Sequence, residues 1–225
     1  MVLEASIRDA LGITGVSASN GYGMAVPFFR TFDPDDKRIT PYNPATGKGI
    51  AVSGIVYKSD GTPVYGTPEP KSVEEQLSRI LTFKWEVQTN IPLGEDASLN
   101  VPALRLGEVM LTYAEAENEL GHLEEAKTYV DKIRSRAGLE NLPANLNMAS
   151  MRDAILDERG WELYHEGYRR EDLVRHGKLL EKVNEKYHYY FGKDMPWKNN
   201  NDRILQPIPT NALLLNPLLK QNPGY

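Results

Sequence analysis

The stretch MRDAILDERGWELYHEGYRREDLVRHGK (Met151–Lys178) decides the fold, because it combines a helical pattern with a regular row of charges. Glu158, Glu162 and Glu166 recur at every fourth position, so on a helix their carboxylates stack along one face. Like charges at that spacing repel one another, and the row therefore needs cations from other residues. Gly167 predicts a helix stop of the left-handed type. We expect a helix, a tight turn and a second helix.

Two interpretations of the acidic row compete. Paired carboxylates about 5 to 10 Å apart can hydrolyse a glycosidic bond. Carboxylates that face arginines instead form an ionic lattice between packed helices. Arginines follow the turn in near-equal number to the acids, and no motif marks a cleft, so the lattice is favoured over a catalytic pair. The predicted lattice consists of Glu158, Glu162, Glu166, Arg169, Asp172 and Arg175.

The composition is that of an ordinary globular protein. The chain has 225 residues, of which 40% are hydrophobic and 25% charged, enough for a substantial core in one domain or two small ones. A net charge of −5 argues against a nucleic-acid partner, because a surface that binds nucleic acid normally carries a basic patch. The sequence contains no apolar run of about 18 residues and no visible export signal. Without cysteine, disulfides and thiol catalysis are excluded within this chain.

No motif in the sequence predicts catalysis, a cofactor or a metal site. The four histidines do not form a zinc-binding pair, and the nucleophile-elbow, Walker and dinucleotide motifs are absent from the sequence. The run DPDD (Asp33–Asp36) could supply oxygen ligands to calcium. It lacks the spacing and the glycine of an EF-hand, so a turn with an aspartate cap is favoured.

Residues 1–100 form the first predicted region, which is rich in glycine and proline and therefore in loops. A short helix is expected at Leu3–Leu11, and a hairpin at Lys48–Tyr65 that turns at Ser59–Gly61. The partial alternation of Ile80–Thr89 predicts a strand.

Aromatic residues in this region are the candidate ligand contacts. Tyr22, Phe28 and Phe29 lie between turn residues, where their rings could stack on the flat apolar face of a ligand such as a sugar, and Trp85 is a further candidate. The alternative is a loop held onto the domain by buried aromatic rings.

Residues 101–225 form the second predicted region, which is helical and is expected to make one domain with the first. Val101–Leu139 reads as two amphipathic helices that are joined at Gly121 and capped by Gly138, similar to one tetratricopeptide repeat. The predicted apolar faces consist of Leu106, Met110, Tyr113 and Ala114 on the first helix and Ala126, Val130 and Ile133 on the second. One repeat cannot bury its own outer face, so that face needs a partner.

The rest of this region is a helix from about Glu171 to Glu185, an aromatic loop and a tail. Four prolines in Ile204–Tyr225 predict an extended tail with one helical turn near Thr210. The fold class is therefore mostly α, with one tetratricopeptide-like helix pair, further helices and a loop-rich segment with a small β-hairpin.

The order of four sequence blocks resembles the C-terminal half of the SusD/RagB family, a group of glycan- or nutrient-binding outer-membrane lipoproteins of Bacteroidetes. The blocks are RLGEVMLTYAEAENEL, KIRSRAGL, ERGWELYHEGYRREDLVRHGK and LQPIPTNALLLNPLLKQNPGY. The resemblance is strong over about residues 102–225, and it is most specific in the third block and in the closing QNPGY.

The resemblance implies a surface-exposed protein of the outer membrane that binds an oligosaccharide and is not an enzyme. It implies a SusC-like TonB-dependent transporter as partner, and a membrane connection only through a lipid anchor outside this chain. It also implies that the chain is a fragment without the N-terminal helical repeats of the family. The alternative is a helical-repeat adaptor that binds proteins or peptides.

Overall fold

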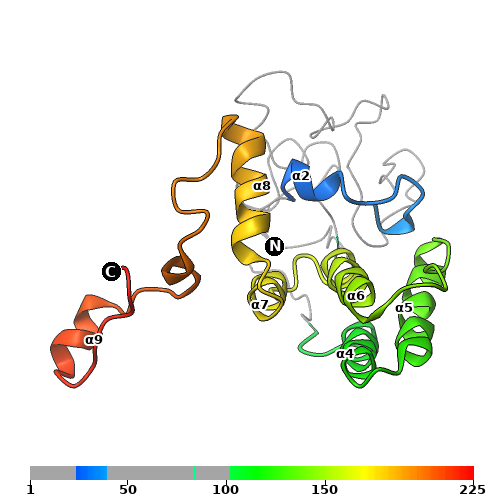
Figure 1. Cartoon of the computed structure of the whole chain (residues 1–225), viewed down its shortest axis with the longest axis horizontal. Helices are drawn as coiled ribbons and strands as arrows, with labels where there is room; N and C mark the ends of the chain where they lie inside the picture. The colour runs from blue at the N-terminus through cyan, green and yellow to red at the C-terminus, as the bar shows by residue number, and fades with distance from the viewer. Residues whose placement is uncertain (1–23, 40–83, 85–101) are drawn as a thin grey trace, which may run out of the picture. The chain divides into compact units, whose positions relative to one another are not determined.

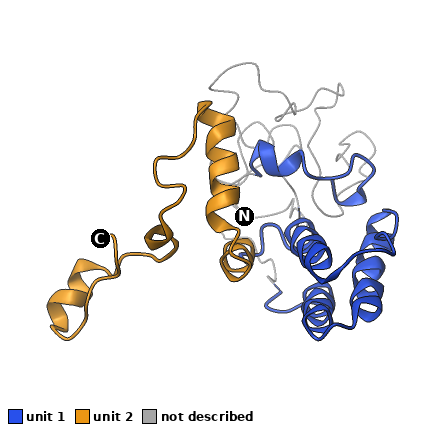
Figure 2. Ribbon diagram, in the orientation of Figure 1, with its two compact units in different colours: residues 1–167 blue, residues 168–225 orange. Residues whose placement is uncertain are grey.

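The computed structural model of this chain describes residues 24–39, residue 84 and residues 102–225, which are coloured in Figure 1. The predicted short helix, hairpin and most of the predicted strand lie outside the described residues, as do Tyr22 and Trp85. The chain divides into two compact units, residues 1–167 and residues 168–225 (Figure 2). The described residues are mostly helical, which confirms the predicted fold class.

Three helices form the core of the first unit. They are α4 (Leu106–Glu119), α5 (Leu123–Ala137) and α6 (Met148–Glu162), and each packs on the other two. The core consists of Leu111, Ala114, Ala126, Val130, Ile133, Met151 and Ile155. Ala114 and Ala126 are fully buried, so small side chains lie where α4 meets α5. The helix pair predicted over Val101–Leu139 is confirmed, although the pair begins later, at Leu106, and ends earlier, at Ala137.

The predicted apolar face of α4 was wrong in part. Ala114 is buried as expected, but Leu106 is 70% exposed and Tyr113 is also exposed, whereas Leu111 and Asn118 enter the core. The cause is that α4 carries apolar residues on two sides, and sequence periodicity does not decide which side meets a neighbour. Leu111, Ala114 and Asn118 follow one another at spacings of three and four, so they form one continuous inner face.

The ends of these helices follow local sequence signals. Gly138 has a φ of 82° directly after α5, and the Leu139 N–H donates to the Arg134 carbonyl at 2.9 Å, which confirms the predicted glycine cap. At the start of α6, Asn147 and Ser150 form a reciprocal capping box, with both side-chain to backbone bonds at 2.9 Å. Gly167 has a left-handed φ of 91°, yet α6 already ends at Glu162. Glu166 therefore lies in the turn after the helix.

Two short elements precede the three helices. They are α2 (Val26–Phe29) and the 3-10 helix η1 (Lys37–Ile39). The Asp35 N–H donates to the Asp33 carboxylate at 2.9 Å, and the Arg38 N–H donates to the Asp36 carboxylate at 2.8 Å. The DPDD run therefore forms aspartate-stabilised turns, as favoured from the sequence.

The second unit contains α7 (Arg169–Arg175), α8 (Leu179–Phe191), the 3-10 helix η2 (Asn201–Ile204) and α9 (Thr210–Leu215). The prediction of one helix from about Glu171 to Glu185 was wrong, because Gly177 interrupts it with a φ of 67°. The Lys178 N–H donates back to the Leu173 carbonyl at 2.8 Å and so closes the end of α7.

The tail of the second unit is held by its own polar groups. The Gln221 amide bonds both backbone groups of Ile208, at 2.8 and 2.9 Å, and the Asn222 amide donates to the Gln206 carbonyl at 2.6 Å. The Tyr225 hydroxyl donates to the Leu205 carbonyl at 3.1 Å. α9 confirms the helical turn predicted near Thr210. In the described segments, no helix combines the length and apolar character needed to cross a membrane.

Candidate functional site

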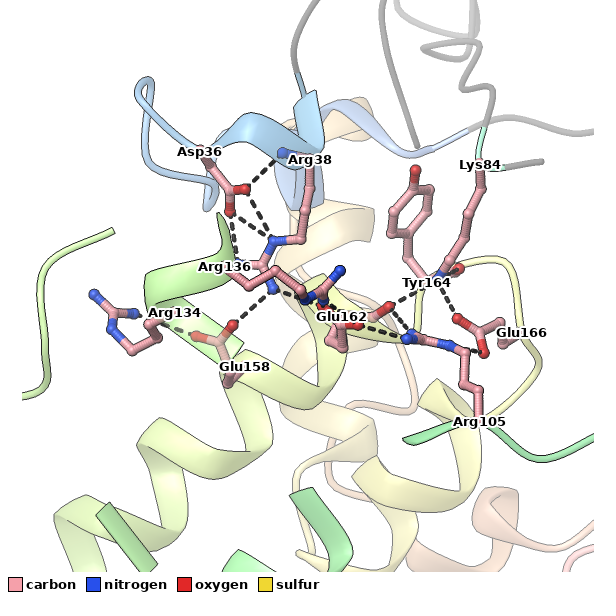
Figure 3. A network of polar contacts seen from close by, with 10 residues as sticks. All are labelled: Asp36, Arg38, Lys84, Arg105, Arg134, Arg136, Glu158, Glu162, Tyr164 and Glu166. Carbon is pink, nitrogen blue, oxygen red and sulfur yellow. Dashed lines mark hydrogen bonds and ion pairs between the residues drawn. The ribbon is translucent and has the colours of Figure 1, made fainter. Parts of the chain in front are cut away.

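The acidic row lies at the C-terminal end of α6, where charged side chains from several segments converge (Figure 3). Glu158 and Glu162 are buried on α6, and Glu166 follows in the turn. The cations come from η1, from α5, from the residue before α4 and from Lys84. The row thus gathers parts of the chain that are far apart in sequence.

Arg38 connects η1 to Glu158. One terminal nitrogen of its guanidinium donates to the Glu158 carboxylate at 2.7 Å. Its Nε and its other terminal nitrogen donate to the Asp36 carboxylate at 2.9 and 2.7 Å. Arg134 of α5 donates to the second oxygen of Glu158 at 3.2 Å. Both oxygens of Glu158 are therefore occupied by arginine.

Glu162 receives three guanidinium groups. Arg136 contacts both of its oxygens at 2.6 Å, Arg105 donates to one at 2.5 Å, and Arg38 donates to the other at 3.2 Å. Because Arg38 also reaches Glu158, this arginine joins two members of the row.

Glu166 is held by Arg105 at 2.7 Å and by the ammonium of Lys84. The same ammonium donates to the carbonyls of Glu162 and Tyr164, at 2.7 and 2.9 Å. These carbonyls belong to the end of α6 and the turn after it, where backbone acceptors need donors from elsewhere. Lys84 therefore acts as a cationic cap for α6.

The pKa shifts follow from this pairing. Burial opposes the charge of Glu162 and Glu166, but the hydrogen bonds and charges of Arg105 and its neighbours outweigh it and lower the pKa of both carboxyls. Burial raises the pKa of Glu158, against the opposing effect of Arg38 and Arg134. Burial also lowers the pKa of Lys84 to about 8, although Glu166 opposes that change.

This arrangement is suited to holding segments together and not to acid–base chemistry. Each carboxylate oxygen of Glu158, Glu162 and Glu166 accepts at least one bond from a cationic side chain. A catalytic base or nucleophile must present a free oxygen to a substrate. The row therefore forms an ionic lattice, and the glycosidase interpretation loses its candidate residues.

The sequence predicted the acidic side of the lattice, but it predicted none of the five cations that the structure places on it. Asp172 is buried and pairs with Arg175 at 2.8 Å within the second unit. Pairing of Arg169 and Arg175 with the acidic row stays a prediction. The cations that the structure places on the row are Arg38, Lys84, Arg105, Arg134 and Arg136. Three of the five lie within or beside helical blocks, and KIRSRAGL carries two of them at alternate positions, which is the signal that could have found them.

The aromatic residues of the 24–39 segment pack on the same end of α6. Phe32 is buried, and its ring lies 6.2 Å from the rings of both Trp161 and Tyr164. Phe28 and Phe29 are half-buried, with their rings 5.5 and 6.5 Å from that of Phe32. A buried aromatic ring, that of Phe32, thus holds this segment onto the domain, which is the alternative to ligand binding given for the aromatic residues. Phe28 and Phe29 are only half-buried, so part of each ring stays accessible to a ligand.

Comparison with known proteins gives a consistent assignment. Residues 56–225 match the sequence model of the SusD family. SusD-like protein P25 of Formosa agariphila is 38% identical over 132 residues, which are 54% of this chain and 24% of that protein. The chain thus spans about a quarter of the length of the curated relatives it matches.

Two solved structures illustrate the likeness in fold. A SusD homolog from Bacteroides thetaiotaomicron has a TM-score of 0.58 and 29% identity, and the match covers 70% of this chain and 34% of that one. The surface glycan-binding protein A from Bacteroides uniformis has a TM-score of 0.51 and 22% identity, over 93% of this chain and 43% of that one. The second likeness shows the fold alone.

Proposed function

The chain belongs to the SusD family, and on this premise we propose that it is part of a nutrient-binding protein that captures oligosaccharides at a bacterial cell surface. The proposed protein delivers its ligand to a SusC-like TonB-dependent transporter in the outer membrane, to which a lipid anchor outside this chain attaches it. The observation that carries the proposal is the family match over residues 56–225. A solved structure with a similar fold is itself described as a surface glycan-binding protein.

The acidic lattice supports binding without cleavage. A glycosidase needs two carboxyl groups that are free to exchange protons or attack the sugar. Here the acids of the row are neutralised by arginine and lysine, so they hold the scaffold on which a ligand-binding surface can be built. Loops on such a scaffold are the usual carriers of binding residues.

The experiment is a panel of oligosaccharides titrated into the protein by calorimetry, followed by a hydrolysis assay on every glycan that binds. We expect saturable binding of at least one glycan and no cleavage of it. Cleavage that persists in the purified protein would refute the non-enzymatic part of the proposal. Failure of the whole panel to bind would refute glycan capture.

Within this proposal, Phe28 and Phe29 are the candidate stacking residues that the structure describes. Replacing a stacking ring by alanine should weaken binding by about 1 to 3 kcal/mol, close to the contribution of its buried area. Phe28→Ala and Phe29→Ala are compared with Tyr22→Ala and Trp85→Ala against the best glycan of the panel. If all four folded variants bind within about twofold of the parent, the ligand contacts lie elsewhere.

A second candidate function is protein binding by the helix pair. It is favoured by an apolar stripe on the outer side of α4, formed by Leu106, Val109, Tyr113 and Leu120, of which Leu106 and Leu120 are 70% and 68% exposed. Leu106→Ser with Leu120→Ser should weaken a complex with the proposed transporter without changing glycan affinity. An unchanged complex would remove this stripe from consideration.

A further inference from the structure

The second unit contains a small open pocket that the proposed function does not use. It lies where α7, α8 and η2 come together and has a volume of about 290 Å³. Its lining consists of Leu173, Val174, Gly177, Leu179, Leu180, Lys198, Asn199, Asn201 and Ile204. The pocket lies entirely within residues 168–225 and is separate from the acidic lattice.

The lining divides by burial into five aliphatic residues, which we call the floor, and the exposed polar residues Lys198, Asn199 and Asn201, which we call the rim. Leu173 is buried, and Val174, Leu179, Leu180 and Ile204 are half-buried. A glycine takes the place of a side chain at position 177, where the chain turns between α7 and α8. Such a floor favours the C–H face of a small ring over a fully polar ion.

Two asparagines outside the pocket lining, Asn184 and Asn200, hold the loop that carries the rim. The Asn184 amide donates to Asp194 at 3.0 Å and its oxygen accepts from the Met195 N–H at 2.8 Å, while the Met195 side chain is buried. The Asn200 side chain caps η2 by accepting from the Asp202 N–H at 2.9 Å. The loop that carries the rim is therefore fixed before any ligand arrives.

Asn199 and Asn201 are the two rim groups available to a ligand. They flank Asn200, and both line the pocket with exposed side chains. Each amide offers donors and an acceptor, a combination suited to the hydroxyl groups of a sugar. Within the described residues, neither amide takes part in a protein hydrogen bond, unlike that of Asn200 between them.

The charge of the pocket favours a neutral ligand. Lys198 is the charged residue of its lining, and its ammonium is paired with Asp194. That ammonium, together with the Asn184 amide, lowers the pKa of Asp194 to about 2, so the carboxylate stays ionised and the pair stays neutral overall. An acidic sugar would find no uncompensated cation here.

We propose that this pocket is a subsite for one neutral pyranose ring, with the aliphatic floor under its C–H face and Asn199 and Asn201 bonded to its hydroxyls. A volume near the lower limit of ligand pockets fits one ring and not an extended chain. The inference rests on the proposed glycan-binding function and adds a second contact region to it, on a unit where the candidate rings Phe28 and Phe29 do not lie.

The test is a titration of the full chain, isotopically labelled for NMR, with methyl glycosides of glucose, galactose and mannose. Methyl glucuronoside serves as the acidic comparison and glycerol as the control for a small polyol. We expect a saturable shift of the Asn199 and Asn201 side-chain amides and of the Leu180 and Ile204 methyl groups with at least one neutral glycoside. Glucuronoside and glycerol should shift them much less.

Variants make the assignment specific. Loss of one hydrogen bond to the ligand corresponds to roughly a twofold to tenfold loss of affinity, so Asn199→Ala and Asn201→Ala should each weaken binding by about that factor. Asn211→Ala, an exposed asparagine of α9 outside the pocket, is the matched control and should bind like the parent. Unchanged affinity in both pocket variants, with folding verified by circular dichroism, would overturn the subsite.

The outcome also separates this inference from the proposed function. If an oligosaccharide binds but leaves the four pocket signals unmoved, the subsite is overturned and glycan capture stands. If no glycan binds in calorimetry or NMR, both are overturned.

Discussion

Glu162 accepts bonds from Arg38, Arg105 and Arg136 although only 2% of its side chain is exposed. Removing one partner from a buried ion pair leaves an uncompensated charge, which costs about 3 to 5 kcal/mol. Glu162→Gln should therefore lower the free energy of unfolding by that order, measured by chemical denaturation of the full chain.

The matched comparison is an ion pair near the surface. Lys182 pairs with Glu185 three residues later at 3.0 Å, and the two side chains are 36% and 55% exposed. Because solvent screens such a pair, Lys182→Met should cost less than about 1 kcal/mol. Equal losses from both variants would mean that burial does not distinguish the two pairs.

The acidic row also makes stability depend on pH. The pKa values of Glu162 and Glu166 are lowered from 4.5 in the folded protein, so at acidic pH the unfolded chain binds more protons at these sites. Their contribution is fully present above about pH 4.5 and is lost as the pH falls through the folded values. The raised pKa of Glu158 acts in the opposite direction and reduces the net effect.

We expect the melting temperature to fall as the pH decreases from about 5 to 3, and to fall less in the double variant Glu162→Gln with Glu166→Gln. Thermal melts at matched ionic strength measure both. An identical pH dependence in parent and variant would assign the acid sensitivity to other carboxyls.

At the scale of elements, the start of α6 depends on one capping pair. The Asn147 carboxamide oxygen accepts from the Ser150 N–H, and the Ser150 hydroxyl accepts from the Asn147 N–H. Asn147→Ala removes the first of these bonds and should cost about 1 kcal/mol. Asn145→Ala, two residues earlier and exposed, should change the unfolding free energy by less than about 0.5 kcal/mol. The prediction fails if the two variants unfold alike.

Much of the helical architecture could be predicted because it depends on local signals. The pair α4–α5 follows from apolar spacing and from the glycine caps, which act within a few residues. The break between α7 and α8 was missed because His176–Lys178 gives only one strong stop signal, Gly177, inside an otherwise helical pattern. The buried face of α4 was missed because neighbours, not periodicity, select it.

The candidate site was predictable only on its acidic side. Three glutamates at a spacing of four are visible in one short stretch of sequence, whereas Arg38 and Lys84 reach them from 120 and 82 positions away. Pairing at such distances is decided by tertiary folding, which a single sequence does not display. Phe32 illustrates the same limit, because its ring is buried against Trp161 and Tyr164, which lie 129 and 132 positions later in the sequence.

At the scale of the whole molecule, the two units differ in how much apolar surface their helices bury. α5 contributes Ala126, Val130, Ile133 and Ala137 to the interior, whereas α8, of similar length, has no fully buried residue. Helices with few buried contacts open more readily than core helices. Amide hydrogens of α8 should therefore exchange faster than those of α5, as measured by mass spectrometry after pulsed deuteration.

α5 is the internal control for α8, because the two helices belong to the same chain and are labelled in the same sample. Exchange of the two helices at one common rate, at a pH where global unfolding is rare, would show that the molecule opens as a single cooperative unit.

The long reach of the lattice bonds has a consequence for the order of folding. Contacts among α4, α5 and α6 join segments that follow one another closely, whereas Arg38 meets Glu158 and Glu162 across 120 and 124 positions. Closing such loops costs entropy before any bond forms, so the three helices are expected to dock early and the lattice to lock late. Substitutions at Arg38 should then leave the refolding rate nearly unchanged and accelerate unfolding. The lattice would thus contribute to the kinetic stability of the native state, because it slows unfolding without speeding folding.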